Sequence, residues 1–108
     1  MLRGRVSLRS ALKIEAMKVA FDDRAIADLN NIYRFIAENS SVSAKMIVER
    51  LVSDIDRLAE FPRMGRTARV PGVREWVVPR LPYVIVYEID ELISVLTVTA
   101  VFHTARRR

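Results

Sequence analysis

Residues 83–89, with the sequence YVIVYEI, decide the fold of this chain. Their β-branched and aromatic side chains are typical of a β-strand. Two similar runs flank them, VREWVV at residues 73–78 and ISVLTVTAV at residues 93–101. The separators, Pro-Arg-Leu-Pro at 79–82 and Asp-Glu at 90–91, are typical of turns. The pattern therefore predicts a meander of three consecutive strands joined as hairpins.

Alternation along these strands predicts which side chains share a face. Tyr83 and Tyr87 alternate with Ile85 and are interpreted as packing residues. On the last strand, one face carries Leu96, Val98, Ala100 and Phe102, and the other carries Thr97, Thr99, Val101 and His103. If helices cover the Leu96 face, His103 is expected on the open face of the sheet. The alternative is that His103 caps the strand end or bonds a carbonyl.

Two helices are expected before the sheet. Apolar residues recur at three- and four-residue steps within 24–38 and again within 44–58, as on the buried stripe of a helix. Asp22 and Asp23 are expected to cap the first helix, and Ser41 or Ser43 the second. A short strand at 18–21 precedes them. The prediction is an α+β fold of order β-α-α-β-β-β, with a small, mainly antiparallel sheet packed against an N-terminal helical hairpin.

Composition limits the classes of function. A chain of 108 residues fits one domain, and without cysteine it excludes disulfides, thiol catalysis and a zinc finger. The single histidine argues against a transition-metal site, so no metal and no cofactor are expected. The absence of cysteine favours the cytoplasm. No run approaches the roughly 20 apolar residues of a membrane span, so no membrane partner is expected.

Charge is distributed unevenly along the chain. Residues 63–108 carry eight basic and four acidic side chains, whereas residues 17–62 carry six and eight. The sheet half is therefore expected to present a cationic surface to a polyanion or an acidic protein. Residues 1–16 are interpreted as a basic extension, either disordered or a mis-assigned start, and residues 17–108 as the folded domain.

Several segments together resemble a known family. In order along the chain they are residues 18–21, 28–36, 61–66, 70–75, 81–87 and 103–107. Over about ninety residues they resemble the RelE/ParE superfamily of type II toxin-antitoxin toxins, also called plasmid stabilization proteins. The resemblance implies the same β-α-α-β-β-β fold. It also implies a toxin that a cognate antitoxin neutralises by forming a hetero-oligomer with it.

Two activities occur in this superfamily. RelE-like toxins are ribosome-dependent endonucleases that cut mRNA, whereas ParE-like toxins bind DNA gyrase and trap it on cleaved DNA without being nucleases. In the nuclease reading, the resemblance implies His103 for proton transfer and Arg74, Arg80 and Arg106 as electrostatic stabilisers. The target-binding set would be Arg66, Arg74, Arg80, His103 and Arg106.

This chain departs from the nuclease pattern at two positions. Val84 stands where those nucleases usually place a basic residue, and Thr104 follows His103 where they usually have tyrosine. The sequence therefore favours the ParE-like branch and a non-enzymatic gyrase inhibitor. An mRNA interferase and an inactive orphan member remain the alternatives.

Overall fold

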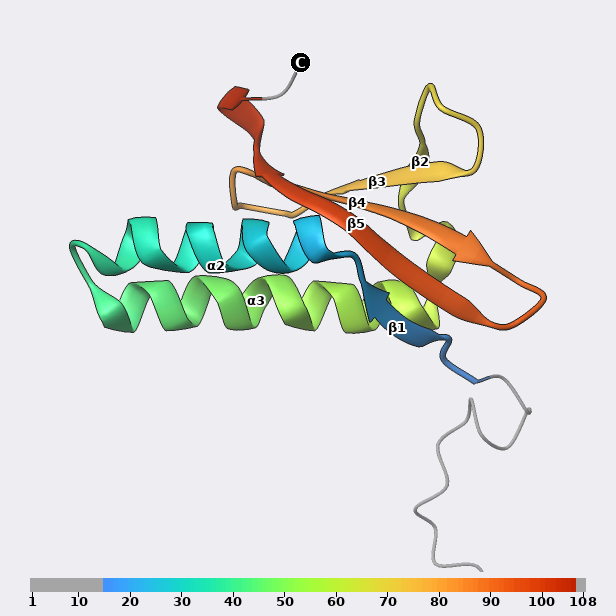
Figure 1. The fold of residues 1–108 in the computed structure, drawn as a ribbon, viewed down its shortest axis with the longest axis horizontal. Helices are drawn as coiled ribbons and strands as arrows, with labels where there is room; N and C mark the ends of the chain where they lie inside the picture. Colours follow the sequence, from blue (N-terminus) through green and yellow to red (C-terminus); the bar gives the residue numbers. More distant parts are fainter. Residues whose placement is uncertain (1–14, 107–108) are drawn as a thin grey trace, which may run out of the picture.

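The computed structural model describes residues 15–106. Its elements, coloured along the chain in Figure 1, are β1 (Lys18–Phe21), α2 (Asp23–Ala37), α3 (Ser41–Glu60), the 3-10 turn η1 (Pro62–Met64), β2 (Arg66–Thr67), β3 (Val73–Val77), β4 (Tyr83–Asp90), β5 (Val95–His103) and the 3-10 turn η2 (Thr104–Arg106). The predicted order is confirmed, with β2 as an unpredicted two-residue addition. No helix in this part of the chain is long and apolar enough to span a membrane.

The five strands form one sheet in the order β1-β5-β4-β3-β2. The predicted meander of β3, β4 and β5 is confirmed, because both neighbouring pairs run antiparallel. β1 adds in parallel to β5 and pairs Val19 with Leu96. The helices α2 and α3 form the predicted hairpin and lie together on one side of the sheet (Figure 1).

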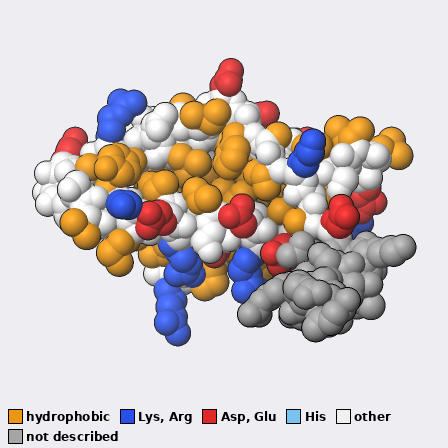
Figure 2. Space-filling view, turned by 90° about the horizontal axis from the view of Figure 1, so that it is seen from below, with side chains coloured by type: hydrophobic (Ala, Val, Ile, Leu, Met, Phe, Trp, Pro, Cys, Tyr) orange, Lys and Arg blue, Asp and Glu red, His pale blue; other side chains and the backbone are white. Residues whose placement is uncertain are grey.

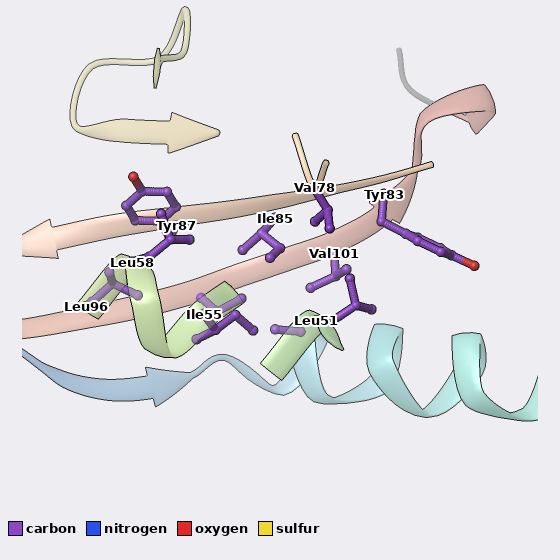
Figure 3. Packing of buried hydrophobic residues seen from close by; sticks show 11 residues of the cluster. Leu51, Ile55, Leu58, Val78, Tyr83, Ile85, Tyr87, Leu96 and Val101 are labelled. Carbon is purple, nitrogen blue, oxygen red and sulfur yellow. The ribbon is translucent and has the colours of Figure 1, made fainter. Parts of the chain in front are cut away.

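The core lies between this hairpin and the sheet. Leu51, Ile55 and Leu58 of α3 are essentially inaccessible to solvent and pack against β4 and β5. Figure 3 shows Tyr83 and Tyr87 of β4 at opposite ends of this cluster. The packing role predicted for both tyrosines is confirmed, since both belong to the buried cluster.

The helix caps differ in detail from the prediction. The second helix is capped one residue earlier than expected, by Ser40, whose Oγ accepts the Ser43 N–H at 3.1 Å. Asp22 is the N-cap residue of α2, as expected, but its side chain makes no capping hydrogen bond. The predicted caps at Ser41 and Ser43 are wrong because Ser40 is the residue with extended backbone before the first turn.

The face predicted for His103 is wrong because β5 contains a bulge. Tyr87 pairs with Val98 while Val86 pairs with Ala100, so Thr99 has no partner in the ladder. One extra residue reverses the alternation beyond it. Val101 therefore joins the buried cluster beneath the sheet, and His103 follows it to the helix-covered face.

The turn between α3 and the sheet is tied to β4 by the Tyr87 hydroxyl. This group donates to the Pro62 carbonyl at 2.6 Å and accepts the Gly65 N–H at 3.0 Å. A Cβ on residue 65 would lie 2.4 Å from that hydroxyl oxygen and 2.8 Å from the Glu75 carbonyl. Residue 65 must therefore be glycine, because the Tyr87 hydroxyl and the Glu75 carbonyl approach its backbone too closely for a side chain.

We expect Tyr87→Phe to lower the free energy of unfolding by about 1–3 kcal/mol, because it leaves a buried N–H and carbonyl without their partner. Urea denaturation followed by circular dichroism would measure the change. Tyr33→Phe is the matched control, since Tyr33 is exposed and should change stability by less than about 0.5 kcal/mol. Equal effects in the two variants would contradict a structural role for the Tyr87 hydroxyl.

The same tyrosine makes stability depend on alkaline pH. Burial raises the pKa of Tyr87 above its ordinary value of 10.0, against smaller opposing effects of the Gly65 hydrogen bond and the Arg74 charge. The folded state therefore keeps a proton that the unfolded state loses above pH 10. The stability that the protonated Tyr87 hydroxyl contributes is complete below pH 10 and is lost as pH rises through the pKa of the folded state. The difference in free energy of unfolding between wild type and Tyr87→Phe should therefore decrease above pH 10, as measured by urea unfolding at several pH values. A difference that stays constant would contradict the raised pKa of Tyr87.

Candidate target-binding site

A groove of about 1240 Å³ crosses the C-terminal half of β5. One wall comes from α2, with Arg24, Asp28 and Phe35, and the other from β2 and the loop after it, with Arg66 and Arg69. The floor is formed by β4 and β5 residues, among them Tyr83, Val101, Phe102 and His103. The groove therefore joins α2 to the β2–β3 loop around the end of β5.

The groove includes an edge of the sheet that no strand within residues 15–106 covers. Pairing of β1 with β5 ends at Phe21 and Val98, so β5 continues beyond it without a neighbour on that side. At this edge the Asp28 carboxylate of α2 accepts the Val101 N–H at 2.9 Å. Arg24 lies 3.8 Å from the same carboxylate.

Charges in the groove are nearly balanced. Arg66 lies 3.5 Å from Glu75 on the adjacent strand, and Arg24 is paired with Asp28. Arg69 is exposed and forms no ion pair within residues 15–106. The groove thus mixes apolar and charged side chains and, among the described residues, has one unpaired arginine, so it is not a strongly cationic patch.

His103 is held at the end of β5. It pairs in register with Tyr83, and their rings meet edge to face with centroids 5.4 Å apart. Its Nδ1 accepts the Ala105 N–H at 3.0 Å, so the neutral ring carries its proton on Nε2. This geometry fits a histidine that caps the strand end, which was the alternative to an open-face position.

The other predicted site residues are dispersed. Arg66 joins His103 at the groove, whereas Arg74 lies on the helix-covered face and donates from Nη1 to the Gly65 carbonyl at 2.6 Å. Arg80 is exposed in the β3–β4 turn, which reaches the end of β5 through the Thr104 N–H bond to Pro82. The side chain of Arg106 lies outside the described residues.

Two aspartates with clear partners were not predicted. Asp54 is only 7% exposed and accepts the Trp76 indole N–H at 2.9 Å, while Asp28 caps the edge of β5. Both fall on the apolar stripes of their helices, three residues after Leu51 and Ala25 respectively. A carboxylate inside an apolar stripe is the signal that would have found them. No cluster of three or more metal-ligating side chains occurs in the described part of the chain.

We expect Arg74→Ala to destabilise the fold by about 1.5–3 kcal/mol, since it removes a charged hydrogen bond from the Gly65 carbonyl. Thermal and urea unfolding would measure the loss. Arg66→Ala is the control, because its 62% exposed side chain contributes at most about 1 kcal/mol through Glu75. Unchanged stability in Arg74→Ala would contradict this structural role of the Arg74 guanidinium.

Sequence comparisons relate this chain to known toxins. The family model for the ParE toxin of the type II toxin-antitoxin system parDE matches residues 19–108. Toxin RelE2 of Caulobacter vibrioides is 38% identical over 90 residues, covering 82% of this chain and 97% of that protein. The Y4kP protein of Sinorhizobium fredii is 36% identical over 75 residues, covering 69% and 78%.

Solved structures share the fold at lower identity. The chromosomal ParDE system from P. aeruginosa superposes with a TM-score of 0.71 at 22% identity, covering 82% of this chain and 96% of that one. The E. coli RelBE toxin-antitoxin complex gives 0.64 at 21% identity, covering 85% and 100%. Because the family model spans most of the chain, this protein belongs to the ParE toxin family, within the RelE/ParE superfamily of type II toxin-antitoxin toxins.

Proposed function

We propose that this toxin acts by binding DNA gyrase and holding it on cleaved DNA, and that a cognate antitoxin neutralises it. The observation that carries the proposal is that Arg74 and His103 lie apart and each makes a hydrogen bond within the fold. Arg74 bonds the Gly65 carbonyl on the helix-covered face, and His103 uses Nδ1 to accept the Ala105 N–H. The pair that a nuclease would bring together is thus engaged in structural contacts.

Chemistry at a phosphodiester makes stricter demands than the groove meets. Attack by a 2′-hydroxyl needs a base, cations beside the phosphate and a proton donor for the leaving oxygen. Arg66 shares the groove with His103, but it lies 3.5 Å from Glu75, which offsets its charge. Val84 is fully buried and offers an aliphatic side chain on the middle strand. These features support a binding role over RNA cleavage.

The groove suits a folded protein target. Its walls mix apolar side chains such as Phe35 and Val70 with Arg24, Arg66 and Arg69, which resembles the polar rim and apolar centre of a protein interface. Arg69, which lines the groove, and Arg80, in the β3–β4 turn, are exposed cations. We expect binding to weaken with salt, because exposed charges are screened within about 8–10 Å at physiological ionic strength.

An antitoxin has a separate apolar surface available to it. Figure 2 shows hydrophobic side chains gathered in a band on the face seen from below, which is the side of the helical hairpin. Apart from Phe35, which lines the groove, the large apolar residues exposed on the two helices are Ile26, Tyr33, Val42, Met46 and Val52. Such a band suits an amphipathic helix of a partner. The P. aeruginosa ParDE system and E. coli RelBE are toxin-antitoxin pairs with this fold, which supports a hetero-oligomer here.

We expect purified toxin to convert supercoiled plasmid and gyrase into linear, protein-linked DNA, and the cognate antitoxin to prevent it. Gel electrophoresis with and without proteinase would measure the product. His103→Ala should still give this product at saturating toxin, because His103 is assigned no chemical step and its place in the groove can affect only the affinity for gyrase.

The opposite pattern would overturn the proposal. In that pattern, the wild-type toxin leaves gyrase unaffected and cuts mRNA in translating ribosomes. The His103→Ala variant leaves the mRNA intact. That outcome would assign the RelE-like endonuclease activity and give His103 the proton-transfer role.

A further inference from the structure

The turn that carries Arg80 has an unusual residue in it. The Leu81 N–H donates to the Val78 carbonyl at 3.3 Å, with Pro79 and Arg80 as the central residues. Arg80 has φ of 67°, so the turn is of type II. Type II turns favour glycine or asparagine at this third position, because a β-carbon crowds the left-handed backbone. An arginine here costs stability that glycine would not.

Several contacts hold this turn at the end of the sheet. The Val78 N–H donates to the Tyr83 carbonyl at 2.9 Å, and the Thr104 N–H donates to the Pro82 carbonyl at 2.8 Å. A residue in a strained conformation persists only when its surroundings fix it, and such residues concentrate at functional sites. The backbone of Arg80 is therefore fixed although its side chain is exposed.

A third restraint comes from α3, far away in the sequence. Arg50 donates from Nη2 to the Pro79 carbonyl at 2.8 Å, and its Nε lies 3.4 Å from Asp54 Oδ1. The other oxygen of Asp54 accepts the Trp76 indole N–H at 2.9 Å. Asp54 thus orients the Arg50 guanidinium from one side, while Trp76 fixes Asp54 to β3. The chain of contacts ends on the residue that precedes Arg80.

We infer that Arg50, oriented by Asp54 and Trp76, is a positioning residue that holds the Arg80 turn ready for the target. Arg80 is the contact and carries the charge that meets an anionic group on the gyrase surface. Fixing the turn beforehand reduces the ordering cost of binding, which raises affinity without adding a contact. This inference rests on the proposed function for its target and on the geometry of the turn for its mechanism.

A double-mutant cycle tests the dependence of Arg50 on Arg80. Gyrase poisoning and growth inhibition would be titrated for wild type, Arg50→Ala, Arg80→Ala and the double variant. We expect Arg80→Ala to weaken potency about tenfold or more and Arg50→Ala about threefold to tenfold, in the range of a single interface contact. In the Arg80→Ala background, Arg50→Ala should have no further effect.

Two further variants separate folding from positioning. Arg57→Ala removes an exposed arginine from the same helix without touching the turn, so it should keep full potency. Arg80→Gly suits the left-handed backbone, so its melting temperature should equal or exceed that of wild type while its potency falls like that of Arg80→Ala. Hydrogen exchange at Leu81 should accelerate in Arg50→Ala and stay unchanged in Arg57→Ala.

The outcomes distinguish a failure of the positioning role of Arg50 from a failure of the gyrase assignment. Equal losses from Arg50→Ala in both backgrounds, full potency of Arg80→Ala, or unchanged exchange at Leu81 would overturn the positioning role. A wild-type toxin that inhibits growth but leaves gyrase unaffected would overturn the gyrase assignment alone. The double-mutant cycle would then use growth inhibition as its measure of potency. Hydrogen exchange at Leu81 tests the contact between Arg50 and the turn even if the protein is not toxic.

Discussion

The hydroxyl of Tyr87 is the interaction on which the rest of the structure depends. The chain leaves α3 at Glu60 and must reverse within a few residues to enter the sheet, and this single group bonds both ends of the reversal, at Pro62 and Gly65. Arg74 then bonds the carbonyl of the same glycine from β3. The turn, the first strands of the meander and the middle strand are therefore fixed together. The position of the groove wall formed by β2 and the loop after it follows from that junction.

Several arginines of this protein are bound within the fold and are not free to contact a target. The sheet half is rich in basic residues, yet Arg74 and Arg66 are engaged within the fold, by a backbone carbonyl and by Glu75 respectively. Arg50, from the more acidic half, supports a turn instead of facing a ligand. In the sheet half, Arg69 and Arg80 are exposed and form no ion pair within residues 15–106. Such an arrangement favours recognition of a folded surface over stabilisation of charge developing in a reaction.

Sequence periodicity predicted the elements well and the sidedness of one strand poorly. The helical hairpin and the meander follow from apolar spacing, which the packed core preserves. The bulge at Thr99 could not be predicted, because Thr97 and Thr99 look alike to an alternating pattern and only the pairing with β4 distinguishes them. The roles of Arg74 and Asp54 depend on partners more than eight residues away in sequence, Gly65 and Trp76. Side-chain type alone does not reveal such partners.

The contact between Asp28 and the Val101 amide also limits how the sheet can grow. An uncovered strand edge is a template on which another extended chain can pair, and that pairing leads to aggregates. Here the edge of β5 beyond β1 offers a carboxylate in place of a free N–H. A sixth strand would have to displace that carboxylate and leave its charge beside the incoming backbone. The carboxylate on α2 thus occupies the amide that such pairing would need at this edge, while the groove beside it stays open to side-chain contacts.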